Sequence, residues 1–247
     1  MERAALPGAV SSSPWREARL VGAREETATA RTLRFDVPGW PGHLPGQHVD
    51  LRLTAEDGYT AQRSYSLSAP VDGSQVEVTV QLVADGEVSP YLVEEMQSGD
   101  ALEMLGPLGG WFVWRAHATE PVLLVGGGSG IAPLRAIWQA RRQANLAAPT
   151  RLLYSARTPD DVYFADDLRD TPGVTVLFTR RSPAGDARPA HRIDPDDLRT
   201  QGLSADLGPT CYVCGPTAFV ESVTQKLIDA GHDVSRVRAE RFGSTGG

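Results

Sequence analysis

The sequence predicts two domains, an antiparallel β-barrel followed by a doubly wound α/β domain. Three observations carry this prediction: the length, a run of short alternating strands in the first half, and a strand–glycine turn–helix unit in the second. The 247 residues exceed a typical domain of about 100–200 residues. Apolar residues make up 41% and charged residues 22%, as in globular proteins. We expect a tail at residues 1–13, the barrel at 14–117 and the α/β domain at 118–247.

Alternation of apolar and polar residues with period two marks strands in the first half. Such strands are expected at residues 31–37, 48–53, 63–68 and 75–83. Pro-Gly and Asp-Gly turns separate them, which is typical of an antiparallel barrel. One helix is predicted to interrupt the strands, with Ser89 as its N-cap and Pro90 in its first turn. A free Ser89 hydroxyl at this helix start would suit an anion.

Strands and helices alternate in the second half. A continuous apolar strand at 121–125 precedes Gly126-Gly-Gly-Ser-Gly130 and a helix, and a second strand–helix unit is expected at 151–169. Further strands are expected at 174–178, 211–213 and 235–242. This order predicts a parallel sheet with helices on both faces. The glycine turn lets a phosphate approach the backbone at a helix start, although close packing also explains such glycines.

Composition excludes several classes of function. The net charge of −7 argues against a nucleic-acid binder. We find neither a membrane span nor a secretory signal in the sequence, and we therefore expect a cytoplasmic protein. Two cysteines cannot supply the ligands of a four-thiolate iron–sulfur cluster. Cys211 and Cys214 are three residues apart on a predicted strand, so their side chains should point to opposite faces. The five histidines show no metal-ligand spacing, and His48 is interpreted as structural.

Five ordered motifs resemble the ferredoxin–NADP reductase superfamily. They are Arg63-Ser-Tyr-Ser66, Gly86-Glu-Val-Ser89, Gly106-Pro-Leu-Gly-Gly-Trp-Phe112, Cys214-Gly-Pro216 and Glu240-Arg-Phe242. The resemblance spans residues 15–242, nearly the whole chain. It implies a flavin-binding barrel and a nicotinamide-nucleotide domain, and therefore FAD together with NADPH or NADH as cofactors.

The resemblance assigns the flavin contacts residue by residue. Arg63 would hold the flavin pyrophosphate, Tyr65 would pack on one face of the ring, and Ser66 would lie near its N5 atom. Phe242 would cover the other face. The remaining expected flavin contacts are Ser64, Gly86, Val88 and Ser89. Plant-type members end on a tyrosine at the position of Phe242, whereas here five more residues follow, so we expect nicotinamide to displace this side chain in a different way.

The resemblance also assigns the nicotinamide coenzyme. Cys214 would line the nicotinamide pocket and Glu240 would shape it, which gives Ser66, Cys214 and Glu240 as the catalytic set. The expected coenzyme contacts are Gly127, Gly128, Ser129, Gly130, Gly215 and Pro216. Arg157 and Arg180 resemble contacts to a 2′-phosphate and favour NADPH, because a guanidinium presents several donors to phosphate. Asp160 and Asp161 are acids that would instead favour NADH.

The predicted function is hydride transfer from NAD(P)H to FAD, with onward electron transfer to a separate acceptor protein. Many bacterial members of the superfamily continue into a cluster domain and this sequence does not, so we expect the acceptor to be a second protein or a diffusible molecule. We also expect the enzyme to be a monomer. A reductase of a small acceptor, such as free flavin or a quinone, is one alternative. A non-catalytic flavin subunit that only relays electrons is the other.

Overall fold

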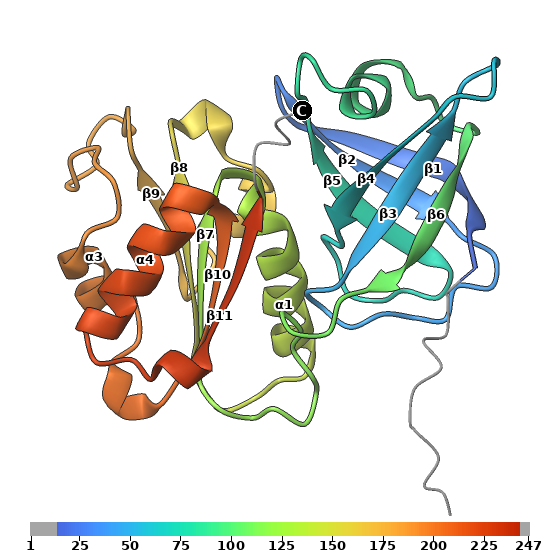
Figure 1. The fold of residues 1–247 in the computed structure, drawn as a ribbon. Helices are drawn as coiled ribbons and strands as arrows, with labels where there is room; N and C mark the ends of the chain where they lie inside the picture. Colours follow the sequence, from blue (N-terminus) through green and yellow to red (C-terminus); the bar gives the residue numbers. More distant parts are fainter. Residues whose placement is uncertain (1–13, 243–247) are drawn as a thin grey trace, which may run out of the picture.

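A computed structural model describes residues 14–242 and shows two sheets, one in each half of the chain (Figure 1). The first sheet is antiparallel, with strand order β4-β3-β6-β1-β2-β5. Its strands are β1 Arg16–Thr27, β2 Ala30–Asp36, β3 His48–Thr54, β4 Thr60–Ser66, β5 Gln75–Gln81 and β6 Ala101–Leu108. A bridge between Leu67 and Val78 joins the chain after β4 to β5, so the two ends of the sheet meet and the barrel closes.

The inward residues of these strands form the barrel core. Leu33, Phe35, Val76 and Val78 are fully buried on β2 and β5, as their period-two alternation predicts. Burial of apolar surface of this kind stabilises the sheet by about 25 cal/mol per Å². The barrel core therefore supports strand β4, whose outward side chains include the partly exposed Arg63.

The helix predicted after Ser89 is a single π-helical turn, η1 Tyr91–Glu95, and Ser89 does not cap it. The Ser89 hydroxyl accepts a hydrogen bond from the Val83 backbone N–H at 3.0 Å and is buried. The expectation of a free hydroxyl was wrong, because the loop from Val83 turns back on itself at Gly86 and brings a backbone donor to the serine.

The second sheet is parallel, with strand order β11-β10-β7-β8-β9. Its strands are β7 Val122–Gly127, β8 Thr150–Ala156, β9 Val174–Phe178, β10 Thr210–Pro216 and β11 Val237–Phe242. The helices are α1 Ile131–Gln143, α2 Ala165–Leu168, α3 Pro195–Gln201 and α4 Thr217–Asp229. Short 3-10 turns lie at η2 Gly128–Gly130, η3 Pro159–Asp161, η4 Ala205–Leu207 and η5 Val234–Arg236. The predicted order of a barrel followed by a doubly wound domain is confirmed.

The two faces of the parallel sheet carry separate cores. Helix α1 packs with Leu124 and Cys214 on one face, whereas α3 and α4 pack with Val125 and Cys211 on the other. Figure 1 shows α1 on the side of the sheet that faces the barrel. Both cysteines are free and buried, and they lie on opposite faces as their spacing predicts.

The second strand–helix unit is shorter than expected. Helix α2 has only four residues, because Phe164 before it adopts a left-handed conformation with φ 56° and Arg169 after it is extended. None of the helices between residues 14 and 242 is long and apolar enough to cross a membrane.

Candidate functional site

The first cavity, which we call the glycine-turn cavity, has a volume of about 480 Å³ and opens above the carboxyl ends of β7 and β8. Gly127, Gly128 and Ser129 line it on one side and Pro216 and Phe219 on another. Thr27, Thr29 and Gln81 of the barrel complete its wall. The cavity therefore lies between the domains, at the edge of the sheet where doubly wound folds bind ligands.

The glycines of the turn have different physical roles. A Cβ atom on Gly130 would lie 2.3 Å from the Cys214 carbonyl oxygen, and one on Gly127 would lie 2.9 Å from the Phe219 ring. Gly128 has φ +55°, and a Cβ there would meet nothing within 4 Å. Gly130 and Gly127 thus allow close packing against β10 and α4, whereas Gly128 leaves open space in which an anion can approach the backbone.

The second cavity, which we call the Ser66 cavity, has a volume of about 370 Å³ and is also lined by residues of both domains. The barrel supplies Ser64 and Ser66, and β11 supplies Glu240 and Phe242. The Ser66 hydroxyl donates to Glu240 Oε1 at 3.2 Å. Burial raises the pKa of Glu240 to about 7, although this hydrogen bond acts in the opposite direction.

The register of β10 and β11 brings Cys214 beside Glu240. These two residues are direct partners in the parallel pair, and Pro216 is the partner of Phe242. Burial and the neighbouring Glu240 raise the pKa of the Cys214 thiol well above its usual value, so the thiol is neutral near pH 7. The predicted catalytic residues Ser66, Cys214 and Glu240 are therefore brought together, by strands from both domains.

Arg63 and Tyr65 lie on β4 beside this site. The Arg63 guanidinium donates to Glu87 Oε2 at 2.8 Å, and both side chains are partly exposed. The Tyr59 hydroxyl donates to the other oxygen of Glu87 at 2.6 Å. Tyr65 is half-buried against the barrel core, and burial raises the pKa of its hydroxyl to about 12. Glu87 of the 86–89 motif therefore forms an ion pair with Arg63 of the 63–66 motif.

A further cavity of about 880 Å³ lies beside Glu87 and is lined on that side by Tyr59, Ala61 and Tyr91. Gly86 and Val88 flank Glu87 in the chain, and Val88 is buried in the barrel core. Glu87, the ion-pair partner of Arg63, therefore lines this cavity together with two tyrosines, Tyr59 and Tyr91.

Of the arginines predicted to select the coenzyme, the structure places only Arg157 in the lining of the glycine-turn cavity. Arg157 lies 3.4 Å from Asp161, a lining acid. Arg180 is exposed, and its backbone N–H donates to the Arg157 carbonyl oxygen, but its side chain is not part of the lining. Arg192 does line the cavity and was missed, because it follows a loop with no periodic pattern.

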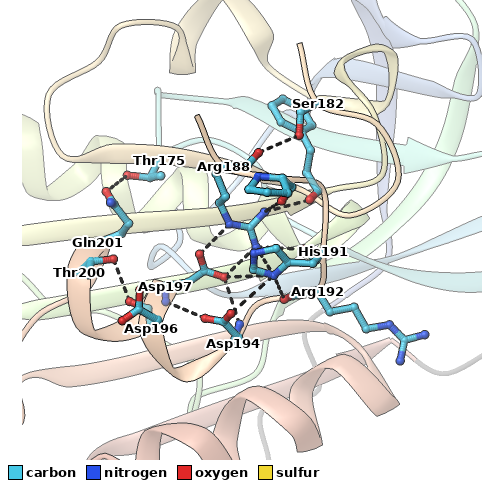
Figure 2. A network of polar contacts seen from close by, with 12 residues as sticks. Thr175, Ser182, Arg188, His191, Arg192, Asp194, Asp196, Asp197, Thr200 and Gln201 are labelled. Atoms are coloured by element: carbon cyan, nitrogen blue, oxygen red, sulfur yellow. Dashed lines mark hydrogen bonds and ion pairs between the residues drawn. The ribbon is translucent and has the colours of Figure 1, made fainter. Parts of the chain in front are cut away.

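A polar network fixes the loop that carries Arg192 (Figure 2). Arg188 donates to both oxygens of Asp197, at 2.6 and 2.7 Å, and Asp194 and Asp197 form a capping box at the start of α3. His191, Asp194 and Asp197 are close enough to hold a metal ion, but the Asp197 carboxylate is already paired with Arg188. We interpret the network as support for the cavity wall at Arg192 and Ile193.

The lining of the Ser66 cavity includes two side chains that sequence reasoning did not assign to it. His48 is the β-sheet partner of Ser66, and Trp111 is 64% exposed beside the glycines at 109 and 110. His48 had been interpreted as structural, and its position in the lining became visible only through the strand register. The period-two alternation of β3 and β4 was the sequence signal that could have placed His48 opposite Ser66.

Comparison with known proteins identifies both domains. The oxidoreductase FAD-binding domain family matches residues 17–113, and the oxidoreductase NAD-binding domain family matches residues 124–225. The reductase component, ferredoxin–NAD(P)(+), of the naphthalene 1,2-dioxygenase/salicylate 5-hydroxylase systems of Ralstonia sp is 28% identical over 227 residues, which are 90% of this chain and 67% of that protein. A flavohemoprotein of Pseudomonas putida is 31% identical over 236 residues, 92% of this chain and 59% of that protein.

A solved structure shows the same fold. The flavohem-like FAD/NAD-binding domain of nitric oxide dioxygenase from Vibrio cholerae superposes with a TM-score of 0.80 at 24% identity, covering 92% of this chain and 98% of that chain. This chain spans only 59–67% of the length of the two curated relatives above.

Fold, site and comparisons together define a two-domain oxidoreductase that binds FAD in its barrel and a nicotinamide nucleotide in its α/β domain. The chain belongs to the ferredoxin reductase family and is an NAD(P)H-dependent flavin oxidoreductase.

Proposed function

We propose that this enzyme uses NADPH to reduce FAD at the Ser66 cavity and passes the electrons to a separate redox protein. The observation that carries this proposal is the meeting of Ser66, Glu240 and Cys214 between the domains, with a 3.2 Å hydrogen bond from Ser66 to Glu240. In this proposal residues 14–117 bind FAD and residues 118–247 bind the coenzyme.

The residues present fit FAD. Arg63 supplies charge-assisted donors for a diphosphate, and its current partner Glu87 is exposed enough to be replaced by a phosphate oxygen. Tyr65 offers an apolar ring face, and Phe242 lines the cavity on the β11 side. When bound, the flavin supplies an N5 atom that accepts hydride and a ring that can release electrons singly.

The chain's own residues orient the reaction. Ser66 places a hydroxyl at the cavity floor, and Glu240 holds it there through the hydrogen bond described above. With a pKa of about 7, Glu240 can hold or release a proton near neutral pH. Cys214 is buried and neutral, so it acts by its size and position and not as a nucleophile.

The residues also fit a nicotinamide dinucleotide phosphate. Gly128 offers open backbone for a pyrophosphate, next to Ser129. Two exposed arginines, Arg157 and Arg192, line the same cavity and can pair with a 2′-phosphate. Asp161, which pairs with Arg157, opposes this preference and is the residue that would favour NADH.

The names of two relatives bear on the acceptor. The Ralstonia relative is named as a reductase component of oxygenase systems, and the Pseudomonas relative as a flavohemoprotein. We propose a separate redox protein by that analogy. A small acceptor such as a quinone, or a role as a passive relay subunit, are the competing functions.

An anaerobic titration tests the proposal. NADPH should bleach the flavin absorbance of the purified holoenzyme at a lower concentration than NADH, and the reduced enzyme should then reduce an added ferredoxin faster than it reduces a quinone. Flavin that neither coenzyme bleaches would support the relay subunit. Preferential reduction of the quinone would support the small-acceptor enzyme.

Cys214→Ser provides a matched test of the site. This variant should keep its flavin but be reduced more slowly at saturating coenzyme, because small misplacement of a reacting ring lowers the rate steeply. Cys211→Ser is the control, since Cys211 is equally buried on the same strand but lies on the opposite face of the sheet. Equal reduction rates in the two variants would place the nicotinamide pocket elsewhere.

A further inference from the structure

Arg135 lies on α1, five residues after the glycine turn, and its side chain is only 8% exposed. An arginine in this position needs partners for its charge, because an unpaired buried guanidinium is strongly unfavourable. The structure supplies them from both domains. Within the α/β domain, the Nε and Nη2 atoms donate to Asp167 Oδ2, with Nε at 2.8 Å, and the guanidinium lies 4.3 Å over the ring of Phe164.

The other arm of the same guanidinium reaches the barrel. Arg135 Nη1 donates to the Ser68 carbonyl oxygen at 2.8 Å and to Glu77 Oε1 at 2.7 Å. The Ser68 hydroxyl donates to the same Glu77 oxygen at 3.2 Å, and the Ser68 backbone N–H donates to the Glu77 carbonyl oxygen. Ser68 and Glu77 of the barrel are thus also held to each other by hydrogen bonds that do not involve Arg135.

The position of these contacts connects the two cofactor sites. Ser68 follows Ser66 by two residues, and α1 begins directly after the glycine turn. Arg135 therefore links the helix that starts at the proposed pyrophosphate site to the chain segment that carries the proposed flavin N5 contact. A planar guanidinium with donors on both sides restricts orientation more than a single point charge does.

A second contact between the domains lies beside the first. Glu26 of β1, whose side chain is 3% exposed, accepts a hydrogen bond at 2.8 Å from the Phe164 backbone N–H. Phe164 is the residue with the left-handed conformation before α2. Strand β1 thus holds the segment that pairs with Arg135, while Glu77 of β5 contacts Arg135 itself.

We propose that Arg135 is a positioning residue that sets how the α/β domain sits against the barrel, and thereby sets the approach of the nicotinamide to the flavin. This inference rests on the proposed function, because it assumes that hydride passes at the Ser66 cavity. Arg135 acts through Ser68 and α1 and touches no reacting atom.

The test compares Arg135→Gln with Arg141→Gln in the FAD-loaded enzyme. Arg141 is a matched control, since it lies on the same helix and is 2% exposed, but its hydrogen bonds end on Thr150, Ala118 and Glu120 and none reaches the barrel strands. Flavin content, the dissociation constant for NADP⁺, the limiting rate of flavin reduction and the long-wavelength absorbance of the nicotinamide–flavin contact are measured for each.

Arg135→Gln should keep its flavin and bind NADP⁺ within about threefold of wild type, but lose about tenfold to a hundredfold in limiting reduction rate together with the long-wavelength band. Arg141→Gln should stay within about twofold of wild type in rate. Arg135→Lys should recover part of the rate. Wild-type rates in Arg135→Gln, or an equal loss in Arg141→Gln, would overturn the inference.

If Arg135→Gln does not fold, Glu77→Gln tests whether the contact between Arg135 and the barrel positions the domains. It removes the barrel carboxylate while the arginine keeps Asp167, and should lower the limiting rate with the same spectral change. Where both single variants fold, the double variant with Arg135→Gln and Glu77→Gln should be no slower than Arg135→Gln alone. The reason is that the same interaction, between Arg135 and Glu77, is lost in both single variants and in the double variant. A folded Glu77→Gln with wild-type rate and spectrum would contradict the proposed positioning.

A structural readout separates this inference from the proposed function. Spin labels at Val21→Cys on the barrel and Glu221→Cys on α4, both exposed positions, report the distance between the domains. The distance distribution should broaden in Arg135→Gln but not in Arg141→Gln. If neither coenzyme reduced the wild-type flavin, the proposed function would fail, and an unchanged distribution would overturn the positioning role independently.

Discussion

At the residue scale, Glu240 is a buried carboxyl group whose protonation changes near neutral pH. Burial raises its pKa from 4.5 to about 7, so the folded protein holds a proton that the unfolded chain has already lost between these values. Stability from this group is fully present below about pH 4.5 and is lost as the pH rises through about 7. At about 1.4 kcal/mol per unit of pKa, the loss is on the order of 3 kcal/mol.

We therefore predict that Glu240→Gln flattens the pH dependence of stability. The flavin-free wild type should lose more unfolding free energy between pH 5.5 and pH 8.5 than the variant, in urea titrations monitored by tryptophan fluorescence. Using the difference between the two proteins cancels all other titrating groups. Parallel pH profiles would mean that the carboxyl group is ionised in the folded protein well below pH 7.

Arg63 gives a second prediction at this scale. If its guanidinium contacts the flavin diphosphate, Arg63→Ala removes a charge-assisted hydrogen bond of about 1.5–3 kcal/mol and should weaken FAD binding about tenfold to hundredfold. Glu87→Gln should strengthen FAD binding a few-fold, because Glu87 competes with phosphate for Arg63 at 2.8 Å. Fluorescence titration of the flavin-free protein measures both. Unchanged affinity in Arg63→Ala would move the diphosphate away from this arginine.

At the element scale, different glycines of the glycine turn serve packing and ligand binding. Gly130→Ala places a Cβ 2.3 Å from the Cys214 carbonyl oxygen, so strand β10 must shift, at a cost of about 1–3 kcal/mol in stability. Gly128→Ala meets no atom within 4 Å, and its strain is limited to the left-handed conformation, about 1–2 kcal/mol.

The two variants should therefore differ in function. Gly130→Ala should slow flavin reduction, because β10 carries Cys214, whereas Gly128→Ala should mainly weaken coenzyme binding by filling the space open to a phosphate. Stopped-flow reduction at several coenzyme concentrations separates the limiting rate from the apparent affinity. The same kinetic defect in both variants would mean that the turn acts only as a packing unit.

Elements of this fold were predictable where periodicity is strong. The strand at 75–83 was expected from alternation and is found as β5 Gln75–Gln81, and the apolar run at 121–125 is found as β7 Val122–Gly127. The turn after Ser89 was not predictable in detail, because the Ser89 hydroxyl can cap a helix or bond back to Val83, and local sequence does not decide between them.

At the scale of the whole molecule, sequence reasoning reached only residues that belong to recognisable motifs. Ser66, Cys214 and Glu240 were predicted to meet through the family resemblance, and the structure brings them together. Arg135 and Glu77 carry no motif, and they meet only because two domains pack at one orientation. Contacts of this kind depend on the relative position of distant elements, which periodicity does not encode.

The distribution of charge over the molecule predicts how the acceptor docks. Residues 1–120 hold 9 basic and 17 acidic side chains, whereas residues 121–247 hold 15 and 14. Near the Ser66 cavity the exposed Arg241 and the half-buried Arg238, which lies 5.7 Å from the Trp111 ring, provide positive charge, but the surrounding barrel is acidic. Attraction to a strongly acidic partner should therefore be largely offset.

We predict that electron transfer to an acceptor protein depends only weakly on salt, which favours a neutral or mildly basic redox protein. Exposed charges are screened beyond about 10 Å at 0.1 M ionic strength, so a docking reaction driven by opposite charges slows steeply above that concentration. Stopped-flow rates with an acidic ferredoxin and with a basic cytochrome should each change less than about threefold between low and high salt. A ferredoxin reaction that is fast at low salt and collapses at high salt would show instead that Arg238 and Arg241 dominate docking, and their replacement by Gln should then abolish the salt effect.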